Sequence, residues 1–235
     1  MAKCNGPDTE MIEATMTENL VRDPSTRCRL VLVVPALPGA ERILSEALHG
    51  GDIATVILPA GSLEEVAYQR HCESLVKLAQ QAGTAALIAG DTRVAGRTGA
   101  DGILAETPGE NARDLVARFS PHKIVGFGGA RERHRALELG EANPDFMFFG
   151  KTDGDIRPEP HPKNLAMANW WSHLIEIPCV IMGGSSLDSV VDCAASGAEF
   201  VALGLAVVSC TNGPREAVRQ ANELLDLHAP AFETE

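Results

Sequence analysis

The chain has 235 residues, of which 45% are hydrophobic, and its formal net charge at pH 7 is −12. A chain of this length can fold as one large α/β domain whose single core buries about 70–75% of the unfolded surface. The acidic balance and the lack of a Lys/Arg cluster exclude a basic nucleic-acid-binding surface, and the longest apolar run, residues 30–37, is far too short to span a membrane.

Residues 1–27 are polar and acidic, and they contain no apolar segment of the signal-peptide type. We therefore expect a flexible N-terminal leader at 1–27, followed by a folded domain at 28–235. The six cysteines are scattered and form no C-x-x-C pair, which is typical of a protein with reduced thiols. These features together predict a cytoplasmic protein.

From residue 30 onward a short apolar run followed by an amphipathic stretch recurs eight times. The apolar runs cover residues 30–34, 53–58, 84–89, 102–105, 123–127, 145–149, 179–182 and 200–203. The first amphipathic stretch extends through residue 47, and the others cover residues 63–81, 93–97, 111–119, 131–139, 165–174, 187–195 and 214–227. The pattern predicts eight strand–helix units.

The apolar runs are continuous rather than alternating, which indicates parallel strands that are buried on both faces. Eight such units predict a single-domain (β/α)₈ TIM barrel. The alternative is an open, doubly wound sheet, but the glycine-rich residues 126–131 lack the last glycine of a G-x-G-x-x-G fingerprint. A Gly or Asn before the fourth, sixth and eighth runs (Gly99, Asn143 and Gly197) is expected to end the preceding helix.

Active sites of such barrels lie at the C-terminal ends of the strands, and phosphate sites are commonly built after the seventh and eighth strands. Gly183, Gly184 and Ser185 follow the seventh run, and Gly204 and Leu205 follow the eighth. Glycines allow a ligand to approach the backbone closely, and the amides that open a helix attract anions. We expect these five residues to bind a phosphate group.

Carboxylates follow the third and fourth runs. Asp91 could bind Mg²⁺ through its oxygens, and it could equally serve only as the N-cap of the next helix. Glu106, with Glu110 close behind it, could supply a second oxygen ligand or lie on the surface as a solvated acid. The pattern makes Asp91 and Glu106 the candidate metal ligands and Mg²⁺ the candidate cofactor.

A long polar loop follows the sixth run, and such loops are uncommon unless they are functional. Its cationic and hydroxyl side chains could contact an anionic substrate. Thr152, Arg157 and Lys163 are the candidate substrate contacts, and Lys151 and His161 are the candidate acid–base residues. The histidines show no metal-ligand spacing.

Residues 88–207 resemble the thiamine-phosphate synthase and thiazole tautomerase superfamily of barrels. The resemblance rests on four segments taken in order: residues 88–103 with Gly-Asp and Gly-Ala-Asp-Gly, residues 123–126, the Ile-Pro…Gly-Gly segment at 177–184, and the closing Gly-Ala-Glu at 197–202. It implies a transferase that joins a thiazole phosphate to an aminopyrimidine pyrophosphate with Mg²⁺. It also implies that Gly183, Gly184, Gly204 and Leu205 hold the thiazole phosphate and that Asp91 binds the metal.

The chain departs from this family where pyrophosphate should bind. The second strand of the family ends in Gln-x-Arg-x-Lys, and the aligned residues here are Val56, Leu58 and Ala60. Three apolar side chains would leave the pyrophosphate charge uncompensated. Gly90 replaces the family's Asn, and Gly109 lies near the place of its second metal-binding Asp.

Three functions remain open at this point: a thiamine-phosphate synthase-like enzyme, a tautomerase or isomerase of a phosphorylated heterocycle or sugar, and a non-catalytic barrel that binds a phosphorylated ligand. All three predict a phosphorylated small molecule as the partner, without nucleic acid or membrane. The sequence leaves the choice between a monomer and a homo-oligomer open.

Overall fold

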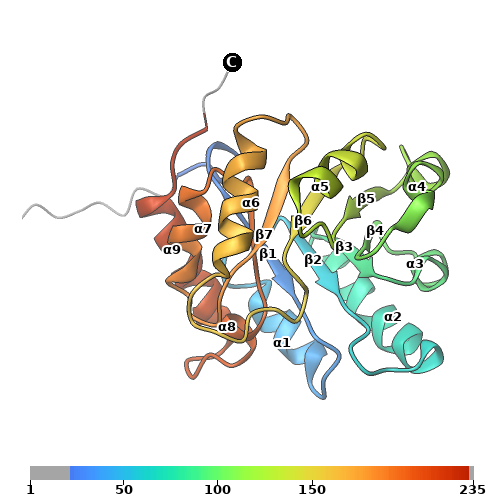
Figure 1. Cartoon of the computed structure of the whole chain (residues 1–235). Coiled ribbons are helices and arrows are strands. Elements are labelled where there is room, and N and C mark those ends of the chain that lie inside the picture. The colour runs from blue at the N-terminus through green and yellow to red at the C-terminus, as the bar shows by residue number, and fades with distance from the viewer. Residues whose placement is uncertain (1–21, 233–235) are drawn as a thin grey trace, which may run out of the picture.

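The computed structural model describes residues 22–232, in which eight parallel strands form one closed barrel in chain order, surrounded by helices (Figure 1). The strands are β1 (Arg29–Val33), β2 (Thr55–Leu58), β3 (Ala85–Ala89), β4 (Gly102–Ala105), β5 (Ile124–Phe127), β6 (Phe146–Phe149), β7 (Cys179–Met182) and β8 (Phe200–Leu203). The single-domain (β/α)₈ barrel is therefore confirmed. Most of the predicted leader, residues 1–21, lies outside the described residues.

A helix follows every strand. The helices are α1 (Ala40–Ala47), α2 (Glu65–Gln81), α3 (Thr92–Thr98), α4 (Ala112–Phe119), α5 (Arg133–Gly140), α6 (Pro162–Ser172), α7 (Ser189–Ala195), α8 (Leu205–Val208) and α9 (Pro214–His228), with 3₁₀ turns at Pro24–Thr26 and Gly109–Asn111. The predicted start of α6 at residue 165 is wrong by three residues. The helix begins at Pro162 because Pro is favourable in the first turn and His161 caps it.

The strands are apolar on both faces because they contact two separate cores. One core fills the barrel interior and contains Val31, Val33, Ile57, Leu87, Ala89, Leu104, Phe146, Phe148, Val180, Met182 and Ala202. The other lies between the strands and the helices and includes Leu30, Leu32, Val56, Leu58 and Trp171. Successive strand residues point alternately into these two cores. This explains why a periodicity of two is missing from the sequence.

The predicted helix-ending residues adopt the left-handed conformation. Gly99 has φ 70°, Gly197 φ 84° and Asn143 φ 56°. An acid follows each of them two residues later and accepts an N–H from the start of the preceding odd-numbered strand. The three bonds are Ala86 N–H to Asp101 at 2.8 Å, Val125 N–H to Asp145 at 2.7 Å and Cys179 N–H to Glu199 at 2.8 Å. At the corresponding place before β2, Asp52 pairs with Arg29 of β1 at 2.7 Å.

Residues 22–27, which sequence patterning assigns to the leader, pack against α9. The guanidinium of Arg22 donates to the carbonyl of Ala229 at 2.7 Å. Arg27 is 2% exposed and forms an ion pair with Asp226 of α9, with 2.6 Å between Nε and Oδ1. These contacts join the entrance of β1 to the last helix.

Tyr68 of α2 ties together the C-terminal ends of β2 and β3. Its buried hydroxyl lies 2.5 Å from the carbonyl oxygen of Leu58 and 3.1 Å from that of Ala89. Burial raises the pKa of the Tyr68 phenol, so the hydroxyl is protonated and able to donate at neutral pH.

Tyr68→Phe is expected to lower the free energy of unfolding by about 1–3 kcal/mol, because two buried carbonyls lose their donor while the ring is kept. Urea unfolding followed by circular dichroism measures the change, and an unchanged m-value serves as the check that the denatured state is the same. A midpoint equal to that of the unaltered protein would show that the hydroxyl contributes nothing.

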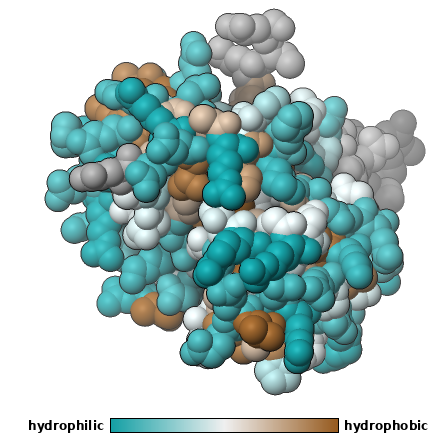
Figure 2. All heavy atoms as spheres, turned by 90° about the vertical axis from the view of Figure 1, so that its right-hand side faces the viewer, coloured by the Kyte–Doolittle hydropathy of each residue, from teal (hydrophilic) through white to brown (hydrophobic). Residues whose placement is uncertain are grey.

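Among the residues described, no helix is long and apolar enough to cross a membrane. The face formed by the α2–α4 side is mostly hydrophilic, with only small separate apolar patches (Figure 2). All five cysteines in the described range, Cys28, Cys72, Cys179, Cys193 and Cys210, are free thiols.

The thiols should differ sharply in reactivity. Burial raises the pKa of Cys72 and of Cys193 to about 12. At pH 8 only about one thiol in 10⁴ of such a group is ionised. A thiol reagent at pH 8 is therefore expected to modify half-buried Cys210 well before Cys72 and Cys193, as peptide mass spectrometry can record, whereas in urea all of them should react. Equal labelling in the folded protein would contradict this expectation.

Candidate functional site

The ends of β7 and β8 lie side by side. Met182 pairs with Ala202, and the N–H of Gly183 donates to the carbonyl of Ala202 at 2.9 Å. Ser185 and Ser186 follow the glycine pair, and Leu205 begins α8 directly after Gly204. The two glycine turns predicted to hold phosphate are thus brought together at the C-terminal mouth of the barrel.

The loop between β6 and α6 covers this place. It runs past α8 in Figure 1. The Asp155 carboxylate accepts a hydrogen bond from the N–H of Leu205. The N–H of Ser185 donates to the carbonyl of Arg157 at 2.7 Å, and that of Ser186 donates to the carbonyl of Pro158 at 3.3 Å. A four-residue segment, 155–158, therefore satisfies amides from both turns.

Both glycines are needed for this close approach. A Cβ at Gly184 would lie 2.0 Å from the carbonyl oxygen of Pro158, and a Cβ at Gly204 would lie 2.9 Å from the Asp155 carboxylate. The amide of Gly184 itself points elsewhere and donates to the hydroxyl of Ser189 at 3.0 Å. The amides of the site that could bind an anion are therefore those of Ser185, Ser186 and Leu205, with Gly184 providing space.

The cations of this loop and of the first turn of α6 face solvent. Lys151, Arg157 and Lys163 are exposed, and none of them forms an ion pair with another residue in the range 22–232. His161 is exposed and caps α6, since its Nδ1 accepts the N–H of Lys163 at 3.2 Å.

The other end of the loop is held by Glu106, the residue directly after β4. The hydroxyl of Thr152, a residue 9% exposed, donates to the Glu106 carboxylate at 2.8 Å. Thr152 is thus placed in a structural contact, and one oxygen of Glu106 is engaged in holding the loop.

Asp91 acts as the N-cap of α3 in this structure. One carboxylate oxygen accepts the N–H of Arg93 at 2.8 Å and that of Val94 at 3.3 Å, while the other lies 3.3 Å from the Arg93 guanidinium. Burial disfavours the charged carboxylate, but the bonds from Arg93 and Val94 outweigh it, so the pKa of Asp91 is lowered. The carboxylate is ionised at neutral pH, as a metal ligand must be.

Asp91 and Glu106 follow adjacent strands, but the described residues contain no group of three His, Cys, Asp or Glu side chains that could hold a metal by themselves. Mg²⁺ often binds through one or two carboxylates together with waters and substrate phosphates. Asp91 and Glu106 are the type of ligand that Mg²⁺ takes in this form.

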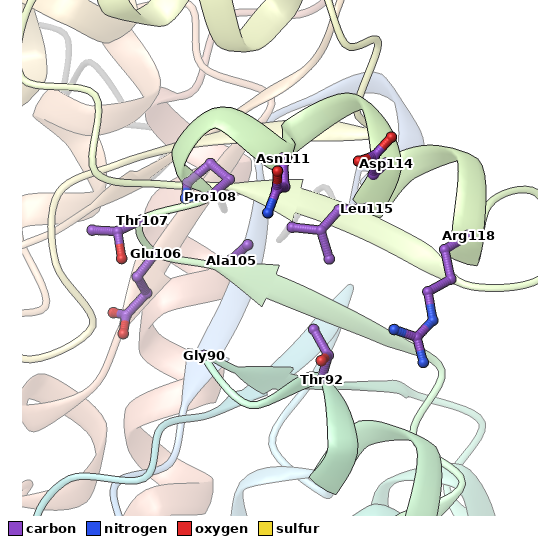
Figure 3. Close-up of a pocket in the computed structure, with 10 residues that line it drawn as sticks. All are labelled: Gly90, Thr92, Ala105, Glu106, Thr107, Pro108, Asn111, Asp114, Leu115 and Arg118. Atoms are coloured by element: carbon purple, nitrogen blue, oxygen red, sulfur yellow. The ribbon is translucent and has the colours of Figure 1, made fainter.

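A cavity of about 420 Å³ lies beside Glu106, between the start of α3, the end of β4 and α4 (Figure 3). Asn111 and Leu115 project toward it from the α4 side, and the Arg118 guanidinium lies at the end opposite Glu106. Its lining is Gly90, Thr92, Ala105, Glu106, Thr107, Pro108, Asn111, Asp114, Leu115 and Arg118. Sequence patterning does not identify Asn111, Asp114 or Arg118, because nothing in their spacing is distinctive.

The end of β2 requires a correction. Val56 and Leu58, aligned with the Gln and the Arg of the resembling family's motif, point outward into the core beneath the helices. Ile57 is the residue of this strand that faces the barrel interior, because side chains alternate along a strand. Ile57 therefore occupies the interior position that the alignment gave to Val56 or Leu58, and the conclusion holds, since residues 55–61 contain no Lys or Arg.

Comparison with known proteins places this site in context. A family model described as thiamine monophosphate synthase matches residues 30–207, well over half of the chain. The thiamine-phosphate synthase of Hyphomonas neptunium is 30% identical over 215 residues, covering 86% of this chain and 96% of that protein. That of Rhodospirillum centenum is 30% identical over 207 residues, covering 85% and 99%.

A solved structure is similar in fold. The thiamine phosphate pyrophosphorylase from Pyrococcus furiosus superposes with a TM-score of 0.72, covering 87% of this chain and 98% of that one, at 17% sequence identity. At this identity the likeness establishes the fold alone, and it agrees with the closed eight-stranded barrel.

Proposed function

Because the chain belongs to the thiamine monophosphate synthase family, we propose that it is a thiamine-phosphate synthase-like transferase that joins a thiazole phosphate to an aminopyrimidine pyrophosphate. The substrates would be phosphorylated small molecules, and the free thiols agree with a reducing, cytoplasmic location.

The observation that carries this proposal is the convergence of three backbone amides, those of Ser185, Ser186 and Leu205, on one short segment of chain. Amides that meet acceptors lying this close together could also meet the oxygens of one phosphate group. We assign the phosphate of the thiazole substrate to this position, with Gly184 and Gly204 giving it room.

The interior of the mouth suits planar rings. The interior-facing residues at or near the strand ends are apolar, namely Val33, Ala89, Phe148 and Met182. A phosphate held at the rim by amides would leave its heterocycle over this apolar floor. In the proposed reaction the carbon–nitrogen bond forms while the carbon–oxygen bond to pyrophosphate breaks, and pyrophosphate leaves with the electron pair. An apolar floor would keep water away from this bond.

The leaving pyrophosphate needs cations that β2 does not provide. The candidates that the sequence offers are three cations after β6, namely Lys151, Arg157 and Lys163. None of them forms an ion pair with a carboxylate in the described part of the chain. We assign them to pyrophosphate binding, which requires the loop after β6 to move. Asp91 and Glu106 would hold Mg²⁺ through their carboxylates, and the ion would neutralise charge on the departing phosphates.

The direct experiment is a condensation assay with the full chain, a thiazole phosphate and an aminopyrimidine pyrophosphate, with and without Mg²⁺. Product and released pyrophosphate are expected in equal amounts, and only with Mg²⁺. No product in the presence of Mg²⁺ would refute the proposed reaction.

An isomerase or tautomerase of a phosphorylated heterocycle is the second candidate. The absence of Lys and Arg from residues 55–61 favours it, since such an enzyme needs no pyrophosphate site. Lys151 and His161 would then be the acid–base pair. This candidate requires that Lys151→Ala and His161→Ala abolish turnover of a single phosphorylated substrate, while the condensation assay gives no product.

A further inference from the structure

The loop after β6 accepts hydrogen bonds from the amides of Ser185, Ser186 and Leu205, the same amides that we assign to phosphate binding. We propose that residues 155–158 form an autoinhibitory latch, which a phosphate ester must displace before it can bind. The inference rests on the proposed function for the identity of the ligand, but the contacts that define the latch are within the chain itself.

Asp155 takes the position of an anion in this latch. The residue is 3% exposed, and its carboxylate accepts the N–H of Leu205, at the first residue of α8 after β8. An acid so deeply buried is unusual unless it is paired. No Lys or Arg in the described chain forms an ion pair with Asp155, so the partner of its carboxylate is a backbone amide of the phosphate site.

Two backbone carbonyls of the same segment take the places of further phosphate oxygens. The carbonyl oxygens of Arg157 and Pro158 accept the amides of Ser185 and Ser186 after β7. The carbonyl of Pro158 also occupies the space over Gly184, where a Cβ would lie only 2.0 Å away. Carboxylate and carbonyl oxygens thus fill both halves of the site, and a phosphate cannot enter while they remain.

Opening of the latch should cost little free energy. Ile156, between the carboxylate and the two carbonyls, is 77% exposed, so opening the loop transfers little apolar surface to water. The loop cations face solvent already. Opening therefore breaks mainly hydrogen bonds to a few amides, and an incoming phosphate re-forms bonds with the same amides. Its greater charge favours it over a carboxylate and two neutral carbonyls.

The test compares Asp155→Asn with Asp153→Asn in the full chain. Both variants remove one negative charge from the same loop, but Asp153 is exposed and Asp155 is buried on Leu205. Calorimetric titration with inorganic phosphate is expected to give about tenfold tighter binding for Asp155→Asn, because a weakened latch leaves a larger open fraction. Asp153→Asn should reproduce only the general effect of the lost charge.

Hydrogen exchange provides a second readout. The amide of Leu205 should exchange faster in Asp155→Asn than in Asp153→Asn. Should Asp155→Asn not fold, Gly184→Ala expels the loop sterically without changing its charge, and faster exchange at Ser185 and Ser186 is expected. Gly96→Ala is the matched control, since a Cβ at Gly96 meets no atom within 4 Å.

Equal phosphate affinity and equal Leu205 exchange in the two Asp variants would overturn the latch. Its failure is distinguishable from failure of the proposed reaction. Tighter phosphate binding by Asp155→Asn without any condensation product leaves the latch standing and removes the reaction. Condensation activity together with equal phosphate affinity and equal Leu205 exchange in the two variants would support the reaction and remove the latch.

Discussion

Replacing Gly204 with valine should lower kcat/KM for the condensation by about a hundredfold, the effect of losing one charge-assisted contact between an amide and a phosphate oxygen. Gly204 lies between β8 and α8 and is buried. A Cβ there would lie 2.9 Å from the Asp155 carboxylate, the group that takes the anion position, and 3.6 Å from the carbonyl of Val33. The branched side chain would fill the space that a phosphate oxygen needs.

Steady-state kinetics with varied thiazole phosphate, together with phosphate titration, measures this effect. Gly96→Val is the control, because it makes the same change in α3, where a Cβ has open space. Valine is no worse than glycine inside a helix, so the control should keep its stability and rate. A Gly204→Val enzyme that keeps its KM for the thiazole phosphate would place the phosphate elsewhere.

Arg27→Met should lower the free energy of unfolding by about 3–5 kcal/mol, because it removes the buried end of an ion pair and leaves the Asp226 carboxylate without its partner. The Arg27 side chain is 2% exposed and that of Asp226 13%. The guanidinium also donates to the carbonyl of Cys28 at 2.8 Å and to the amide oxygen of Asn222 at 3.1 Å. Methionine fills much of the volume but satisfies none of these acceptors.

Urea unfolding measures the loss of stability, with Arg42→Met as the control. Arg42 pairs with Glu46 at 3.3 Å, but its side chain is 77% exposed, and exposed pairs contribute about 0–1 kcal/mol. The double variant Arg27→Met/Asp226→Leu should recover most of the stability, since an apolar pair of similar volume often replaces a buried ion pair without loss. A double variant as unstable as Arg27→Met would show that the uncompensated carboxylate is not the cause.

The barrel could be predicted because the sequence signals that specify it are local and recur in each strand–helix unit. Each strand needs an apolar run and each helix needs a stop signal, and Gly99 and Gly197 provide two of these stops where expected. The convergence of the turns after β7 and β8 follows from closing eight units in order. No knowledge of side-chain contacts is needed for either conclusion.

The role of Asp155 could not be predicted in the same way. Its bond to Leu205 joins residues 50 positions apart, and nothing in the loop sequence marks one of its acids as buried. The error at β2 has a different origin: aligning a motif by its flanking glycine does not determine which of Val56 and Ile57 faces inward. Only the pleat of the strand decides this.

Four acidic residues, each just before an even-numbered strand, group the eight strand–helix units into four consecutive pairs, here called quarters. Asp52, Asp101, Asp145 and Glu199 each precede an even-numbered strand and bind the odd-numbered strand before it, so β1–β2, β3–β4, β5–β6 and β7–β8 are each fastened internally. A break in the chain after an even-numbered strand and its helix keeps both partners of each contact on one segment, whereas a break within a pair puts the partners of one contact on different segments. Circular permutants and chimaeras should therefore tolerate new termini between quarters better than within them.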